Sequence, residues 1–179
     1  MKKVLLLYSG GLDSSVLLHL AQQIGMAPHC LGIDYGQKHI RELEKAELFC
    51  NAYGIPYQRS DIQLEVHSRL TGDLQSEYKG VSEWYVPSRN LMFISIAASH
   101  AENFGIDLIW LGANYDDRLN LFPDCSQEWI VKVNELLKIN ASYPITVEAP
   151  LLGFPKERVQ MLANHLGIKE EEVHSGYSE

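Results

Sequence analysis

The sequence predicts an α/β protein with an open, mainly parallel five-stranded sheet and helices on both faces. Three observations lead to this fold class. Short apolar runs alternate along the chain with longer amphipathic segments. The first apolar run, residues 4–8, has no polar alternation, which is typical of a strand buried on both faces. The 179 residues are 46% hydrophobic and 21% charged, as in ordinary globular proteins, which excludes a disordered chain.

The first part of the chain predicts three strands and two helices. The strands are residues 4–8, 29–35 and 57–62, and the helices are residues 13–24 and 38–53. Apolar residues recur on one face of the first helix, and Gly25 supplies its stop. Residues 64–88 contain glycine and proline but little periodicity. A long irregular segment of this kind is usually functional, so we expect an active-site loop there.

The second part returns to regular alternation. Its predicted helices are residues 90–104, 124–139 and 155–166, and its predicted strands are residues 107–111 and 145–148. A polar loop is expected from Gly112 to Pro123. Ligands of open parallel sheets bind at the carboxyl ends of the strands. The segments that should carry function are therefore residues 9–15, 34–39, 112–124 and 149–156.

The net charge and the cysteine content indicate which partners the protein binds and in which cell compartment it works. The formal net charge of −8 disfavours tight nucleic-acid binding, which needs basic patches against phosphates. The chain has three widely spaced cysteines and no Cys-x-x-Cys, which indicates free thiols in a reducing cytosol. The N-terminal apolar run is too short for a signal peptide, and no stretch approaches the roughly 20 apolar residues of a membrane span. We expect a cytoplasmic protein that does not contact membranes.

The segment after the first strand is a candidate phosphate-binding loop. Its glycines let the backbone approach a ligand, and the helix that follows offers free N–H groups and a favourable dipole. Hydroxyl groups add donors, and Asp13 is a possible helix cap. The alternative is an ordinary Gly-Gly turn before a capped helix. The predicted ATP-binding residues are Ser9, Gly10, Gly11, Leu12, Asp13, Ser14 and Ser15.

This segment, SGGLDS, matches neither a dinucleotide fingerprint nor a Walker-type loop. It resembles the pyrophosphatase loop of the ATP pyrophosphatase (PP-loop) superfamily, whose members adenylate a carboxylate or carbonyl oxygen and release pyrophosphate. Further segments are similar, in order, to motifs of the 7-cyano-7-deazaguanine synthase family of queuosine biosynthesis. They are Asp34–His39, Val86–Asn90, Gly112–Asn114, Phe122–Cys125 and Lys156. The resemblance covers residue 3 to about residue 168.

The resemblance implies an adenine nucleotide alpha hydrolase-like, Rossmann-like fold in one PP-loop domain over residues 1–179, with a short tail at 168–179. It implies ATP and Mg²⁺ as cofactors and conversion of 7-carboxy-7-deazaguanine with ammonia, through an amide, to the nitrile. Asp13, Arg89 and Lys156 become the expected catalytic residues. The expected substrate-binding residues are Asp34, Tyr35, Gln37, His39, Arg89, Asn90, Asn114 and Asp124. The magnesium ligands stay unassigned, with Asp34, Asp116, Asp117 and Asp124 as available acceptors of a metal or of purine-like N–H groups.

Each of these residues also has a simpler structural interpretation. Asp34 is a common turn residue, and Gln37 and His39 fit a solvated helix face. Asn90 and Asp124 are good caps for the helices that begin near them. Lys156 stands in a first helical turn, where the dipole disfavours a cation, and this indicates a nearby anion. The aromatic residues Trp84, Tyr85 and Phe122 are interpreted as packing residues outside the site.

The chain departs from the family pattern near its C-terminus. The family carries a four-cysteine zinc site after the last helix, and Gly176 stands where its first cysteine would fall. Cys30, Cys50 and Cys125 lack the spacing of such a site, so we expect no zinc. Two other functions stay open: a relative that adenylates another acid, tRNA or a protein carboxyl terminus, and a non-catalytic adenine-nucleotide-binding module. A homodimer is also possible.

Overall fold

The structure is a computed structural model that describes residues 1–37, 40–63, 85–119, 122–169 and 173. In this part of the chain five strands form one sheet of order β3-β2-β1-β4-β5, and every pairing is parallel. The strands are β1 (Lys3–Leu7), β2 (Ala27–Asp34), β3 (Tyr57–Asp61), β4 (Leu108–Trp110) and β5 (Thr146–Glu148). The predicted fold class is confirmed.

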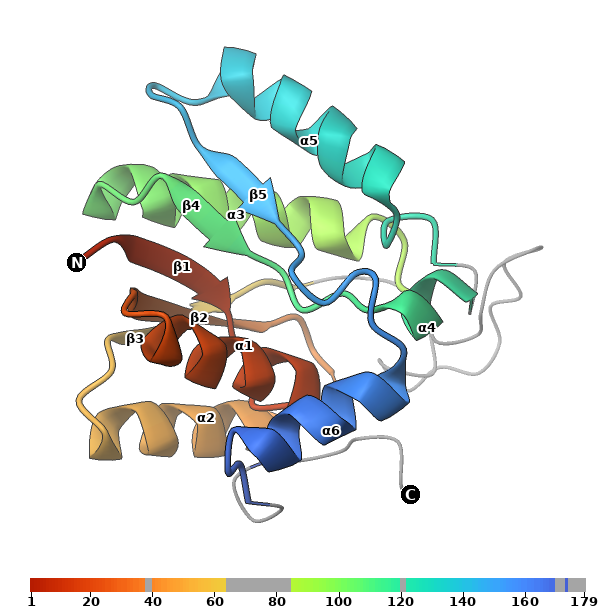
Figure 1. Cartoon of the computed structure of the whole chain (residues 1–179). Coiled ribbons are helices and arrows are strands. Elements are labelled where there is room, and N and C mark those ends of the chain that lie inside the picture. The colour runs from red at the N-terminus through yellow and green to blue at the C-terminus, as the bar shows by residue number, and fades with distance from the viewer. Residues whose placement is uncertain (38–39, 64–84, 120–121, 170–172, 174–179) are drawn as a thin grey trace.

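Helices cover both faces of the sheet (Figure 1). They are α1 (Leu12–Gln23), α2 (Ile40–Ala52), α3 (Arg89–Phe104), α4 (Tyr115–Leu119), α5 (Gln127–Asn140) and α6 (Lys156–His165). Val4 and Leu6 of β1 pack in the core formed with α1, α2 and α6. Leu5 and Leu7 pack in the opposite core, with α3 and α5. The central strand is therefore buried on both faces, which explains its uninterrupted apolar run.

Several helix starts differ from the predicted ones. Helix α5 begins at Gln127, because Ser126 Oγ accepts the Trp129 N–H at 3.1 Å, and Asp124 is not its cap. Helix α3 begins one residue before Asn90, which is therefore a helical residue and not the cap. Asp13 does not cap α1, whose N-cap is Gly11 and has no side-chain cap bond. At α5 a neighbouring serine is the cap, whereas the Asp124 carboxylate accepts the Asn90 N–H of α3, a contact between distant segments that local sequence does not show.

Two further expectations concern the loops. The predicted polar loop after β4 contains the short helix α4, whose five residues are too few to show periodicity. The expected active-site loop lies mostly outside the described residues, which resume at Tyr85. Within the described residues, no helix is long and apolar enough to cross a membrane.

The free edge of β5 is covered by a side chain of α5. Asn134 Nδ2 donates to the Val147 carbonyl at 2.9 Å, and Asn134 Oδ1 accepts the Val147 N–H at 2.7 Å. The neighbouring Thr146 N–H and Glu148 carbonyl bond toward β4 instead. One amide thus pairs with both outward groups of Val147, which blocks this edge position against another strand.

Asn134→Ala should lower the free energy of unfolding by about 1–3 kcal/mol, because it leaves the two partly buried Val147 groups without their partner. Urea denaturation followed by circular dichroism measures this change. Asn140→Ala is the matched control, since Asn140 is an exposed asparagine at the end of the same helix. Equal stability changes in the two variants would contradict a structural role for the Asn134 amide.

Candidate active site

The loop between β1 and α1 is held in place by α2. Gly10 has a φ of +81°, and a Cβ atom there would lie 3.0 Å from the Glu42 carbonyl oxygen and 3.2 Å from Ala46 Cβ. Only glycine fits this conformation at this distance from the α2 backbone. Ser14 Oγ donates to the Gly11 carbonyl at 3.0 Å and lies 3.3 Å from Ser9 Oγ. Because Gly11 makes no side-chain cap bond, the first N–H groups of α1 are available to an anion.

Lys156, at the start of α6, reaches across to this loop. Its Nζ lies 2.6 Å from Asp13 Oδ2, and its backbone N–H donates to Asp116 Oδ2 at 2.5 Å. The other oxygen of Asp13, Oδ1, is buried, and it accepts no hydrogen bond from any described residue. Residues 143 positions apart in the sequence are thus joined at the carboxyl edge of the sheet. A cation from α6 and an incompletely bonded carboxylate therefore lie together at this loop.

Asp117 adds a second carboxylate beside this pair. Its Oδ2 accepts the Asn114 N–H at 2.9 Å. Burial raises the pKa of Asp117, and the nearby charge of Asp13 raises it further, while the Asn114 N–H and Lys156 act in the opposite direction. Two carboxylates and one ammonium group therefore lie close together at this end of the site.

A cavity of about 290 Å³ extends from the loop toward α3. Loop residues and Lys156 line one part of it. Another part of the wall is apolar and aromatic and includes Leu31, Ile33, Tyr35, Phe93 and Phe122. The cavity thus combines a polar anion-binding end with a surface suited to a flat, partly apolar ring.

Arg89 supplies a cation at the aromatic part of the cavity wall. It is the first residue of α3, and its Nη1 donates to Tyr35 Oη at 3.2 Å. The guanidinium carbon lies 5.7 Å from the Tyr35 ring centroid and 6.0 Å from that of Phe93. Two aromatic rings therefore hold a planar, permanently charged group at the cavity wall.

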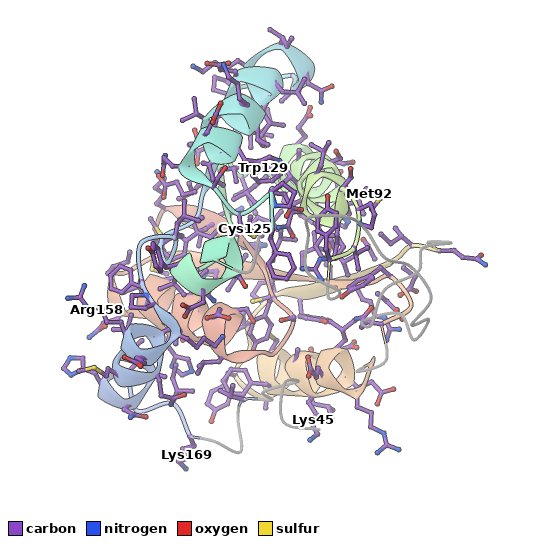
Figure 2. The ribbon with its side chains drawn as sticks, turned by 90° about the vertical axis from the view of Figure 1, so that its right-hand side faces the viewer. Lys45, Met92, Cys125, Trp129, Arg158 and Lys169 are labelled. Carbon is purple, nitrogen blue, oxygen red and sulfur yellow. The ribbon has the colours of Figure 1, made fainter. Side chains whose placement is uncertain are left out.

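Next to Arg89, buried polar groups join α3 to the segment before α5. Asn90 donates from its backbone N–H to Asp124 Oδ2 at 3.3 Å and from Nδ2 to Cys125 Sγ at 3.5 Å. Figure 2 shows Cys125 between the ribbons of α3, α4 and α5. Burial raises the pKa of the Cys125 thiol to about 12, so it is protonated at neutral pH. Cys125 is therefore a neutral wall residue and not a ready nucleophile.

Comparison with known proteins assigns the whole chain to a family. Residues 3–179 match the model of the family described as "Queuosine biosynthesis protein QueC". The chain belongs to the QueC family. This confirms the resemblance found in the sequence motifs.

Three curated relatives of this QueC-family chain share the name 7-cyano-7-deazaguanine synthase. The 7-cyano-7-deazaguanine synthase of Marinobacter nauticus is 33% identical over 98% of this chain and 83% of its own length. That of Chromohalobacter salexigens is 36% identical over 88% of this chain and 66% of its own length. The enzyme of the same name from Thermoplasma acidophilum is 33% identical over 98% of this chain and 79% of its own.

Solved structures support the fold. A predicted subunit of tRNA methyltransferase from Methanocaldococcus jannaschii has a TM-score of 0.62 at 22% identity, over 92% of this chain and 75% of its own. The U34-tRNA thiolase NcsA from Methanococcus maripaludis, which holds a [4Fe-4S] cluster, has a TM-score of 0.61 at 21% identity. It covers 99% of this chain and 60% of its own. At these identities the likeness concerns the fold alone.

Most of the residues predicted for the site do meet at one cavity in this QueC-family chain. The predicted residues that line it are Ser9, Gly11, Leu12, Asp13, Ser14, Tyr35, Gln37, Arg89, Asn90 and Lys156. Gly10 shapes the loop, and Ser15 is buried within α1. His39 lies outside the described residues.

Three predicted substrate-binding residues are placed elsewhere. The Asp34 carboxylate accepts from Arg59 Nη2 at 2.5 Å and from the Gly36 N–H at 3.0 Å. Asn114 is buried, and its Oδ1 accepts the N–H groups at the start of α4. Asp124 is buried against α3. None of the three lines the cavity that the described residues form.

The sequence does not predict every residue that lines the cavity. It favours a packing role for Phe122, yet Phe122 lines the cavity together with Phe93 and Cys125. Phe93 stands one helical turn after Arg89 on the same helix face, and this spacing is a signal that sequence could have given. Cys125 carries no such signal, because its role follows from tertiary packing.

Proposed function

We propose that this QueC-family chain is an ATP-dependent ligase that converts 7-carboxy-7-deazaguanine and ammonia, through an amide, to 7-cyano-7-deazaguanine. One observation carries the proposal: a single cavity joins the anion-binding loop, with Lys156, to the aromatic wall that holds Arg89. A nucleotide phosphate and a flat acid can therefore meet in it. The curated relatives are named for the nitrile product, and the corresponding carboxylic acid is the substrate that we propose from it.

At the loop end, the residues fit a triphosphate with Mg²⁺. The N–H groups of α1 and the Lys156 ammonium suit phosphate oxygens, and the buried Asp13 Oδ1, with Asp117 nearby, supplies the hard oxygen ligands that Mg²⁺ prefers. When bound, the ion neutralises phosphate charge. Lys156 would stabilise the negative charge that grows on the departing pyrophosphate.

At the aromatic end, Arg89 would orient the acid. A carboxylate is inert toward ammonia because its oxygen is a poor leaving group, so it must first be activated. Attack of a carboxylate oxygen on the ATP α-phosphorus gives an acyl adenylate and pyrophosphate. Ammonia then displaces AMP, loses a proton and leaves the amide. The amide oxygen then attacks a second ATP in the same way and releases a second pyrophosphate. The amide nitrogen loses its two protons, and AMP departs with the oxygen as the nitrile forms.

The decisive experiment incubates the protein with ATP, Mg²⁺, 7-carboxy-7-deazaguanine and ammonia, and follows nucleotides and products by mass spectrometry. We expect AMP, pyrophosphate, the amide and the nitrile. ADP and phosphate as the sole nucleotide products would reject adenylation. AMP and pyrophosphate formed only with a different acid would reject the deazapurine substrate while keeping the chemistry.

A further expectation concerns zinc. The 179-residue chain has three cysteines, and all three are buried free thiols: Cys30 and Cys50 lie together in one core and Cys125 in the other. Four thiolates cannot come from three residues, so elemental analysis of the purified chain should give no stoichiometric zinc. One tightly held zinc ion per chain would contradict this expectation. Buried free thiols also fit the reducing cytoplasm that we propose as the location.

A further inference from the structure

The first turn of α3 has no cap of its own. Ser88, the residue before it, has a left-handed φ of 55° and makes no side-chain cap bond. A helix start inside a protein needs acceptors for its free N–H groups. Arg89, which the proposed function places at the acid, is the first residue of this turn. What fixes the start of α3 therefore also fixes Arg89.

The missing acceptor comes from the segment before α5, 34 residues away in the sequence. Asp124 Oδ2 accepts the Asn90 N–H at 3.3 Å. Asn90 Nδ2 in turn donates to the Asp124 carbonyl at 3.4 Å. Asp124 is 7% exposed and does not line the cavity, whereas Arg89 does. The carboxylate thus caps α3, the helix that begins with Arg89, from outside the cavity.

The charges agree with this arrangement. Burial raises the pKa of Asp124, while the Asn90 N–H and the positive charge of Arg89 both lower it. A carboxylate at a helix N-terminus is also stabilised by the helix dipole. Arg89 therefore has a negative charge near it and the rings of Tyr35 and Phe93 beside it.

We infer that Asp124 is a positioning residue: it caps α3 and thereby holds Arg89 in its orientation at the cavity, without contacting the substrate. The sequence motif suggested a substrate contact for Asp124, and the geometry points to an indirect role. The inference rests on the proposed function only for the identity of the acid used as a probe.

The test measures binding of 7-carboxy-7-deazaguanine and of a non-hydrolysable ATP analogue to the full chain by calorimetry. Asp124→Ala should weaken acid binding by about tenfold to a hundredfold, the size of effect that follows the loss of groups orienting metal ligands, which act in the same indirect way. Binding of the ATP analogue should stay unchanged. Asp124→Asn keeps an oxygen acceptor for the Asn90 N–H and should recover part of the loss.

A double-mutant cycle separates an indirect role from a direct one. In an Arg89→Ala background, Asp124→Ala should weaken acid binding no further. An equal loss in both backgrounds, or no loss in wild type, would overturn the inference. Ser126→Ala is the matched control, because it removes the N-cap of α5, two residues along, and has no bond to α3. It should leave acid binding unchanged.

Hydrogen exchange gives a readout that does not depend on the substrate. The Asn90 amide should exchange at least about tenfold faster in Asp124→Ala than in wild type or Ser126→Ala. Unchanged exchange would overturn the capping role. If Arg89→Ala itself left acid binding unchanged, the role proposed for Arg89 would fail, and the exchange result would still decide whether Asp124 caps α3.

Discussion

Asp13→Asn is expected to lower kcat/KM for ATP by a factor of at least about a hundred, the usual effect of removing one electrostatic group from a charged transition state. The substitution keeps the size of the side chain but removes its charge. Asp13 holds Lys156 at 2.6 Å and provides the buried Oδ1 that fits Mg²⁺. Both the cation and the metal-bound phosphates would lose their orientation. Pyrophosphate release measures the effect.

The fold should survive this change. Side-chain exposure is 42% for Lys156 and 21% for Asp13, so their ion pair is partly screened by solvent and contributes little stability. The far-UV spectrum should therefore stay that of wild type. Asp107→Asn, a change of the same kind at an exposed residue before β4, is the matched control and should keep full turnover. Full activity in Asp13→Asn would place phosphate binding elsewhere.

The fold was readable from the sequence because the strongest signals are local. The apolar run of β1 and the helical spacing of α1 need no knowledge of distant contacts, and they specify a strand and a helix joined by a glycine loop. The first residue of a helix is harder to predict where more than one nearby side chain could cap it. At α5 the cap is Ser126, whose Oγ accepts the Trp129 N–H, while the carboxylate of Asp124, equally suited to capping, bonds to α3 instead.

The site was predictable in part for the same reason. Lys156 was assigned to an anion because it stands against a helix dipole, and the anion found beside it is Asp13. Asp34 looked like a ligand contact, but Arg59, 25 residues later, takes up its carboxylate in the ion pair between neighbouring strands. An ion pair of this kind can be predicted only once the order of the strands in the sheet is known. The left-handed φ of Gly10 is likewise invisible in the sequence, where Gly11 is equally plausible.

Arg89→Ala should weaken binding of 7-carboxy-7-deazaguanine by about 2–5 kcal/mol, because truncating one partner of a buried charge pair leaves the other charge unpaired. Binding of the ATP analogue should change little, since Arg89 lies at the aromatic end of the cavity and the anion-binding loop at the other. Calorimetry with each ligand separates the two effects. An equal loss for both ligands would indicate that Arg89 binds phosphate instead.

Arg89→Lys should recover only part of the loss. A lysine keeps the charge, but its ammonium group cannot make the two parallel bonds of a guanidinium to a carboxylate or pack flat against Tyr35 and Phe93. Arg158→Ala is the matched control: Arg158 also lies over an aromatic ring, 6.0 Å from the Phe154 centroid, but does not line the cavity. If Arg158→Ala weakens acid binding as much as Arg89→Ala, the effect comes from general loss of charge and packing. If it does not, the planar cation at the start of α3 is the group that recognises the acid.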